Sequence, residues 1–112
     1  MDPRELARTG EDAAVALLRK RGYEIVGRNI RMPGGEIDVV ARDGNVVVFV
    51  EVKARESRRF GSALSAVNAR KRRTLRRLAG EWLQLFAPRA NARFDVVAAD
   101  GAQLEHYKDA FR

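Results

Sequence analysis

The chain contains no cysteine and only one histidine among its 112 residues. The absence of cysteine excludes disulfide bonds and thiolate chemistry, and it is compatible with a reducing compartment. With His106 as the only histidine, we predict neither a histidine-based metal site nor a nucleophile–base–acid triad. The longest apolar run, Val46 to Val50, is far shorter than a membrane span, and the N-terminus lacks an apolar signal region. We therefore expect a cytoplasmic protein with no membrane partner.

The remaining composition is typical of one folded domain. A chain of 112 residues is long enough for a modest core and too short for two, so we predict a single domain spanning residues 1–112. Hydrophobic residues make up 46% of the chain and charged residues 33%, which separates it from disordered proteins. The formal net charge of +7 indicates a polyanionic partner such as nucleic acid.

The positive charge is concentrated in one part of the chain. Between residues 53 and 77 the only acid is Glu56, and the basic residues are Lys53, Arg55, Arg58, Arg59, Arg70, Lys71, Arg72, Arg73, Arg76 and Arg77. This basic segment follows directly on the acidic motifs described below, so a polyanion bound there would lie next to them.

Hydrophobic periodicity predicts an α/β domain with the element order αβββαβ. The predicted helices run from a cap at Thr9 to about Arg21, before Gly22, and from about Asn68 to Phe86. The predicted strands are Tyr23 to Asn29, Glu36 to Arg42, Val46 to Lys53 and Arg93 to Ala99, with a short fifth strand at Leu104 to Tyr107. The run Val46 to Val50 has no polar alternation, so it should be a central strand buried on both faces.

Two short motifs carry the acidic residues of interest: Gly35-Glu36-Ile37-Asp38 and, after an apolar strand, Glu51-Val52-Lys53. Residues two apart on a strand point to the same side, so Glu36 shares a face with Asp38, and Glu51 with Lys53. The segment Asp43-Gly44-Asn45 is typical of a tight hairpin. A loop at Asp43-Gly44 sets Glu36 opposite Glu51, whereas a loop at Gly44-Asn45 sets Asp38 opposite Glu51. In both registers the four charged groups share one face.

Carboxylates gathered on one face of a sheet repel one another unless a cation is present. Mg²⁺ binds through one or two carboxylates together with substrate phosphate, which Asp38 and Glu51 could supply. Lys53 could orient or deprotonate a water molecule, or stabilise charge on phosphate. The alternative is a surface salt-bridge cluster without chemistry. Glu11 points inward on the first helix, where it is either a first-turn acid favoured by the helix dipole or a group aimed at a site.

The motifs together resemble a known family of small bacterial proteins, the YraN-like family. The segments that carry the resemblance are Gly10-Glu11, Gly35-Glu36-Ile37-Asp38, Phe49-Val50-Glu51-Val52-Lys53, Lys71-Arg72-Arg73 and His106-Tyr107-Lys108-Asp109-Ala110-Phe111. The order of Glu11, Asp38 and Glu51-x-Lys53 also resembles the PD-(D/E)XK nuclease superfamily, with Ile37-Asp38 in place of the Pro-Asp dipeptide. The family is similar to archaeal Holliday-junction resolvases, which are dimers, so a homodimer remains open.

The resemblance implies a single nuclease-like domain with a restriction-endonuclease-like mixed central sheet flanked by helices. It implies a Mg²⁺- or Mn²⁺-dependent endonuclease acting on DNA, including branched or junction DNA. Asp38, Glu51, the Val52 backbone carbonyl and Glu11, directly or through water, would bind the metal. Lys53 would activate the attacking water, and Glu36 would support a metal ligand.

The basic residues would bind nucleic acid: Arg55, Arg58, Arg59, Arg72, Arg73, Arg76 and Arg77. The rival hypothesis is a non-catalytic nucleic-acid-binding or scaffold protein that retains the nuclease fold. A third hypothesis is a structural partner of an RNA assembly.

Overall fold

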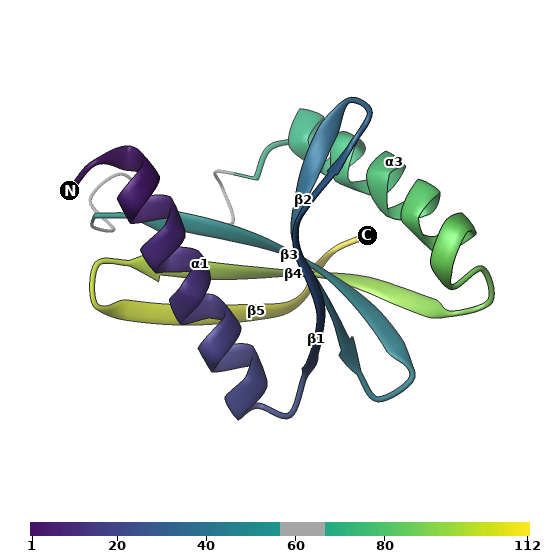
Figure 1. The fold of residues 1–112 in the computed structure, drawn as a ribbon, viewed down its shortest axis with the longest axis horizontal. Coiled ribbons are helices and arrows are strands. Elements are labelled where there is room, and N and C mark those ends of the chain that lie inside the picture. The colour runs from purple at the N-terminus through teal and green to yellow at the C-terminus, as the bar shows by residue number, and fades with distance from the viewer. Residues whose placement is uncertain (57–66) are drawn as a thin grey trace.

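The computed structural model describes residues 1–56 and 67–112, which form two helices and one five-stranded sheet (Figure 1). The helices are α1 (Pro3–Lys20) and α3 (Ala69–Phe86), and the strands are β1 (Glu24–Met32), β2 (Gly35–Asp43), β3 (Val46–Arg55), β4 (Asn91–Asp100) and β5 (Gln103–Phe111). The strand order is β1-β2-β3-β4-β5, with β3 and β4 parallel and the other neighbours antiparallel. The predicted mixed α/β sheet of restriction-endonuclease-like form is confirmed, and β5 is longer than expected.

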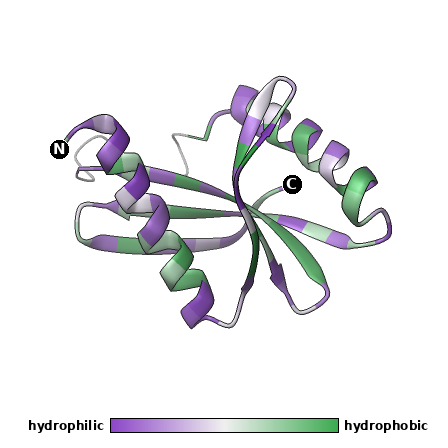
Figure 2. Ribbon diagram, viewed as in Figure 1, coloured by the Kyte–Doolittle hydropathy of each residue, from purple (hydrophilic) through white to green (hydrophobic). Residues whose placement is uncertain are grey.

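The two helices cover opposite faces of the sheet. On β3, Val48 and Val50 pack in the cluster that includes Leu18 of α1, whereas Val47 and Phe49 pack in the cluster that includes Leu78 of α3. Figure 2 shows the hydrophobic residues concentrated in the central strands and a hydrophilic stretch at the start of α3. β3 is thus buried on both faces, as its unbroken apolar run predicts. Within the described residues, neither helix is long and apolar enough to cross a membrane.

Helix α1 begins earlier than the predicted cap at Thr9. The side chain of Asp2 accepts a hydrogen bond from the Arg4 backbone N–H at 2.8 Å, and Pro3 occupies the first turn. Proline is favoured there because its missing N–H would have no helical partner, so Asp2-Pro3 outcompetes Thr9 as a start signal. Glu11 consequently lies in the middle of the helix. The helix dipole at the N-terminus no longer explains an acid at this position.

Helix α3 begins after Asn68, as predicted, and the Asn68 side chain accepts a hydrogen bond from the Lys71 backbone N–H at 2.9 Å. The helix buries Leu75, Leu78, Ala79 and Trp82 against the sheet. Helical spacing would also place Phe86 on the buried face, but Phe86 is 66% exposed because it closes the last turn and packs on the Trp82 ring.

The hairpin between β2 and β3 adopts one of the two registers left open by the sequence. Asp43 pairs with Val46, so the loop is Gly44-Asn45, and Gly44 has the positive φ of 61° that such turns require. The paired residues continue to Val39 and Val50. One step further along this register, Asp38 lies across from Glu51, at the point where the regular pairing ends.

Candidate active site

A cavity of about 230 Å³ lies where α1 crosses β2 and β3, and it collects most of the predicted site residues. Its lining comprises Ala7, Glu11, Asp38, Glu51, Val52, Lys53 and Ala54. Helix α1 contributes Glu11, β2 contributes Asp38, and the end of β3 contributes Glu51 and Lys53. Sequence-distant groups on three elements are therefore brought to one hollow.

Asp38 and Glu51 form a pair of largely buried carboxyl groups, close enough to share a proton. The Val52 backbone N–H donates to Asp38 Oδ2 at 2.8 Å, and the Lys71 ammonium lies 3.5 Å from Glu51 Oε1. The Glu51 side chain is 11% exposed. Its other oxygen, Oε2, is buried and has no hydrogen-bond partner among the described residues. A buried acceptor without a donor is costly unless something else binds there.

The surroundings favour the protonated forms of both carboxyl groups. Burial raises the pKa of Glu51 to about 8, and the neighbouring charge of Asp38 acts in the same direction, while Lys71 opposes it. The pKa of Asp38 is also raised by burial, against the hydrogen bond from the Val52 N–H. Two buried carboxylates in contact resist simultaneous ionisation. A bound cation would stabilise the doubly ionised pair.

Glu11 faces the cavity from α1, but β1 holds its carboxylate. Glu11 Oε1 accepts hydrogen bonds from Arg28 Nε at 3.1 Å and from Asn29 Nδ2 at 2.9 Å. Arg28 also contacts Asp12 at 2.6 Å. Within residues 1–56 and 67–112, no three His, Asp or Glu side chains lie close enough to hold a metal ion by themselves. Glu11 thus shares the cavity with Asp38 and Glu51 without joining them in a preformed three-carboxylate cluster.

Lys53 and Glu36 occupy different positions relative to the carboxylate pair. Lys53 lines the cavity, two residues beyond Glu51 on the same strand. Glu36 does not line the cavity, and its side chain, 38% exposed, lies 3.8 Å from Arg31 Nε. The charge of Glu36 contributes to raising the pKa of Asp38. Glu36 therefore influences the pair electrostatically.

Two of the arginines predicted to bind nucleic acid, Arg55 and Arg72, are half-buried and held by contacts within the fold. Arg55 donates to Asp100 through Nε at 2.8 Å and through Nη2 at 2.9 Å. Arg72 Nε donates to the Val67 carbonyl at 2.9 Å, and its guanidinium lies over the Phe111 ring. These contacts tie side chains to neighbouring elements and reduce their freedom to meet a ligand.

The remaining arginines of the predicted basic surface lie along the outer side of α3. Arg73, Arg76 and Arg77 are all exposed. Arg76 donates to the Arg112 carbonyl at 2.7 Å, and Arg77 contacts the Pro33 and Gly34 carbonyls at 3.2 and 3.3 Å. Arg58 and Arg59 lie outside the described residues.

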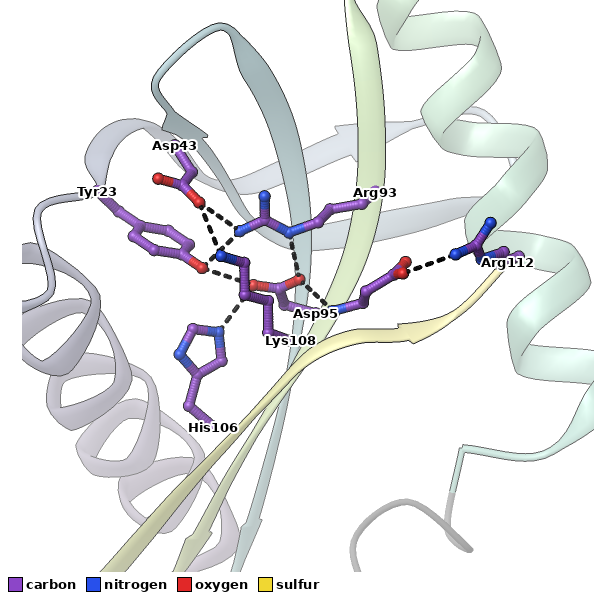
Figure 3. A network of polar contacts seen from close by, with 8 residues as sticks. Tyr23, Asp43, Arg93, Asp95, His106, Lys108 and Arg112 are labelled. Carbon is purple, nitrogen blue, oxygen red and sulfur yellow. Dashed lines mark hydrogen bonds and ion pairs between the residues drawn. The ribbon is translucent and has the colours of Figure 1, made fainter.

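A second polar cluster lies away from the cavity and centres on Asp95, which has no exposed surface (Figure 3). Asp95 accepts hydrogen bonds from Tyr23 at 3.1 Å, Arg93 at 3.1 Å and the Asp109 backbone N–H at 2.9 Å, and its Oδ2 lies 2.7 Å from His106 Nε2. Burial, reinforced by the charge of Asp95, raises the pKa of Tyr23 to about 12, so its hydroxyl remains a donor. Asp95 is an ion-pair residue that holds β4 and β5 to Tyr23, the residue before β1.

Lys71, Arg28 and Asn29 complete the surroundings of the site, and none of them was predicted to act there. Helical spacing shows which face of α3 packs on the sheet, but it does not show how far the ammonium of a lysine such as Lys71 reaches. The positions of Arg28 and Asn29 depend on the irregular pairing of β1 with β2 between Ile25 and Gly27. Asn29 also has a positive φ of 50°, a conformation that asparagine tolerates better than most residues.

A model of the uncharacterised protein family UPF0102 matches residues 10–99, the region that contains the whole cavity except Ala7. The chain belongs to this family. It is similar to a UPF0102 protein of Shewanella amazonensis, with 47% identity over 111 residues that cover 99% of this chain and 100% of the relative. A UPF0102 protein of Thermodesulfovibrio yellowstonii is 40% identical over 107 residues, covering 96% of each chain. These matches confirm the resemblance to the YraN-like family.

Proposed function

We propose that this UPF0102 protein is a metal-dependent nuclease that hydrolyses phosphodiester bonds in DNA. The observation that carries the proposal is the buried Asp38–Glu51 pair, in which Glu51 Oε2 lacks a hydrogen-bond partner among the described residues. A proton shared with Asp38 can satisfy this oxygen while the pair holds one proton, but ionisation of both groups leaves it without a donor, and a cation can take the place of the proton. An unsatisfied buried oxygen beside a second carboxyl group is suited to binding a cation.

The donor set fits a hard divalent ion. Mg²⁺ and Mn²⁺ prefer oxygen ligands, and Mg²⁺ commonly uses one or two carboxylates while keeping several waters. Asp38 and Glu51 would hold the ion, with the Val52 carbonyl as the resemblance implies. Because Arg28 and Asn29 already bind Glu11, its carboxylate would act through a water molecule. When bound, such an ion supplies Lewis-acid stabilisation of the phosphate and lowers the pKa of a bound water.

Other residues of the chain would activate the attacking water and bind the DNA. Lys53 shares the cavity with both carboxyl groups and would accept a proton from the attacking water or stabilise charge on the phosphate. The outer side of α3 would bind the DNA backbone through Arg73, Arg76 and Arg77, which carry no sequence preference when they contact phosphate. Lys71, on the sheet-facing side of the same helix, contacts Glu51, so the first turn of α3 is the part of the basic helix that lies beside the cavity.

The decisive experiment compares Asp38→Asn with the parent protein on junction, flap and linear DNA. Without metal, the carboxylate charge repels phosphate, so Asp38→Asn should bind DNA more tightly in EDTA. In Mg²⁺ this gain should shrink or reverse, because the parent carboxylate now helps to hold the cation, and cleavage by the variant should be lost. Glu24→Gln, which removes an exposed carboxylate from β1 outside the cavity, is a matched control that should cleave like the parent.

An equal shift of DNA affinity in EDTA and in Mg²⁺ would remove Asp38 from a metal site. Failure of the parent to cleave any of the substrates in Mg²⁺ or Mn²⁺ would support the second candidate, a non-catalytic nucleic-acid-binding or scaffold protein. The observation that favours this candidate is that Arg28 and Asn29 already hold the Glu11 carboxylate, which leaves two carboxyl groups for an ion.

A further inference from the structure

Lys71 is the residue through which the basic helix touches the candidate active site. Its ammonium lies 3.5 Å from Glu51 Oε1, and its side chain is 44% exposed, against 11% for Glu51. The Lys71 backbone is held by the Asn68 cap at 2.9 Å. The helix therefore fixes the Lys71 backbone. The flexible side chain extends from the helix and places its ammonium next to the buried Glu51 carboxylate.

The ion pair is placed where a divalent cation would compete with it. The ammonium is close to one oxygen of Glu51, and the other oxygen has no partner among the described residues. A divalent ion on Glu51 and Asp38 would place two positive charges within a few ångströms of the lysine. Like charges at such distances repel, and a half-exposed lysine can relieve the repulsion by moving its flexible stem into solvent.

The scissile phosphate offers the released ammonium a new partner. Lys71 lies on the side of α3 that faces the sheet, one turn before the buried Leu75, and a phosphate bound to a cation on Asp38 and Glu51 would lie close to its ammonium. Lysine binds phosphate as a compact point charge and needs no fixed fork geometry. The same group can therefore serve a carboxylate and a phosphate in turn.

Resting on the proposed function, we infer that Lys71 is a positioning residue that exchanges partners. In the metal-free protein it is the counter-ion of the Asp38–Glu51 pair, and on binding of a divalent cation it is released to the DNA phosphate beside the site. Metal binding and DNA binding are then coupled through Lys71, and the coupling is reciprocal: each ligand strengthens the other.

The first test measures Mn²⁺ binding without DNA, by calorimetry or by the electron paramagnetic resonance of free Mn²⁺. Lys71→Met removes the competing charge and should tighten Mn²⁺ binding about two- to fivefold, the equilibrium equivalent of a partly exposed ion pair. Arg70→Met, which removes an exposed charge from the first turn of the same helix, should leave Mn²⁺ affinity close to that of the parent. Lys71→Arg retains the charge and should also remain close to the parent.

The second test measures DNA affinity with and without Mn²⁺ in a Lys53→Ala background, which prevents cleavage. Metal should increase DNA affinity less in Lys71→Met than in the Lys71 protein, because the variant has no ammonium to release. In EDTA, Lys71→Met should change DNA affinity little, since the negative charge of the Asp38–Glu51 pair already neutralises the lysine.

The outcomes separate this inference from the proposed function. If the parent binds Mn²⁺ and cleaves DNA but Lys71→Met has the same Mn²⁺ affinity as the parent, the partner exchange of Lys71 is overturned. The proposed nuclease function is then unaffected. If Lys71→Met binds Mn²⁺ more tightly and still shows the same metal-dependent gain in DNA affinity as the Lys71 protein, that result overturns the inference that Lys71 is released to a DNA phosphate. A parent that binds no Mn²⁺ overturns both proposals. Circular dichroism would check folding, and Lys71→Gln would replace a Lys71→Met variant that fails to fold.

Discussion

Replacing Glu51 by glutamine should stabilise the metal-free protein at alkaline pH, although Glu51 is a proposed ligand. The folded protein raises the pKa of this carboxyl group from 4.5 to about 8, chiefly by burial and then by the charge of Asp38. The folded state therefore retains a proton that the unfolded chain releases between these two values. The contribution of Glu51 to the stability of the parent is greatest below pH 4.5, falls as the pH rises, and is lost above pH 8.

The size of the effect follows from the shift of the Glu51 pKa. At about 1.4 kcal/mol per pKa unit, ionising Glu51 in the fold costs about 4 kcal/mol between pH 5 and pH 8.5. Glutamine cannot ionise, and any cost of burying its amide is independent of pH in this range. The stability of Glu51→Gln relative to the parent should therefore rise by up to about 4 kcal/mol across this window, or about 16 °C in melting temperature for a domain of this size.

Urea unfolding at several pH values would measure the difference, with the fluorescence of the single tryptophan, the buried Trp82, as the signal. Mg²⁺ or Mn²⁺ added to the parent at pH 8.5 should recover much of the lost stability, because a ligand of the native state stabilises it. Glu81→Gln provides the control and should show little pH-dependent difference from the parent. A stability difference between Glu51→Gln and the parent that is flat from pH 5 to 8.5 would refute the reasoning.

Three further predictions concern cleavage, binding and folding. Lys53→Ala should abolish DNA cleavage in a gel assay while changing DNA affinity little, and undiminished cleavage would exclude Lys53 from the chemistry. Arg73→Ala combined with Arg77→Ala should reduce the slope of log affinity against log salt by about 0.9 for each duplex phosphate that the variant no longer neutralises, and an unchanged slope would place the binding surface elsewhere. Asp95→Asn should lower the free energy of unfolding by about 3 kcal/mol at neutral pH, measured by urea denaturation. This loss should shrink as the pH falls below 3.8, because hydrogen bonds from His106 and Asp109 lower the Asp95 pKa despite its burial; a constant loss would contradict the buried ion pair.

The order of the elements and the identity of the core strand could be read from the sequence because they depend on local periodicity. The apolar run Val46 to Val50 predicted a strand buried on both faces, and β3 has helices on both sides. Asn68 predicted the start of α3 through its capping side chain. The predicted start of α1 was wrong because both Thr9 and Asp2 are plausible caps, and only the proline after Asp2 favours the earlier one.

The acidic motifs were also visible in the sequence, because alternation along a strand places residues two apart on one face. The choice between the two hairpin registers was not visible, since Asp43-Gly44 and Gly44-Asn45 both suit a tight turn. Pairing of Asp43 with Val46 decides it and sets Asp38 across from Glu51. A slip of one residue in that loop would have set Glu36 there instead.

By itself, the sequence determined the composition of the site: two strand motifs with carboxylates and a lysine, followed by a basic helix. The tertiary structure decided which of these groups are in contact and how burial and neighbouring charges shift their pKa values. Burial under α1 raises the Glu51 pKa, β1 binds Glu11 through Arg28, and α3 brings Lys71 to Glu51. These contacts join residues 17 to 20 positions apart in the chain, and no local pattern specifies such distances because they depend on how the helices pack on the sheet.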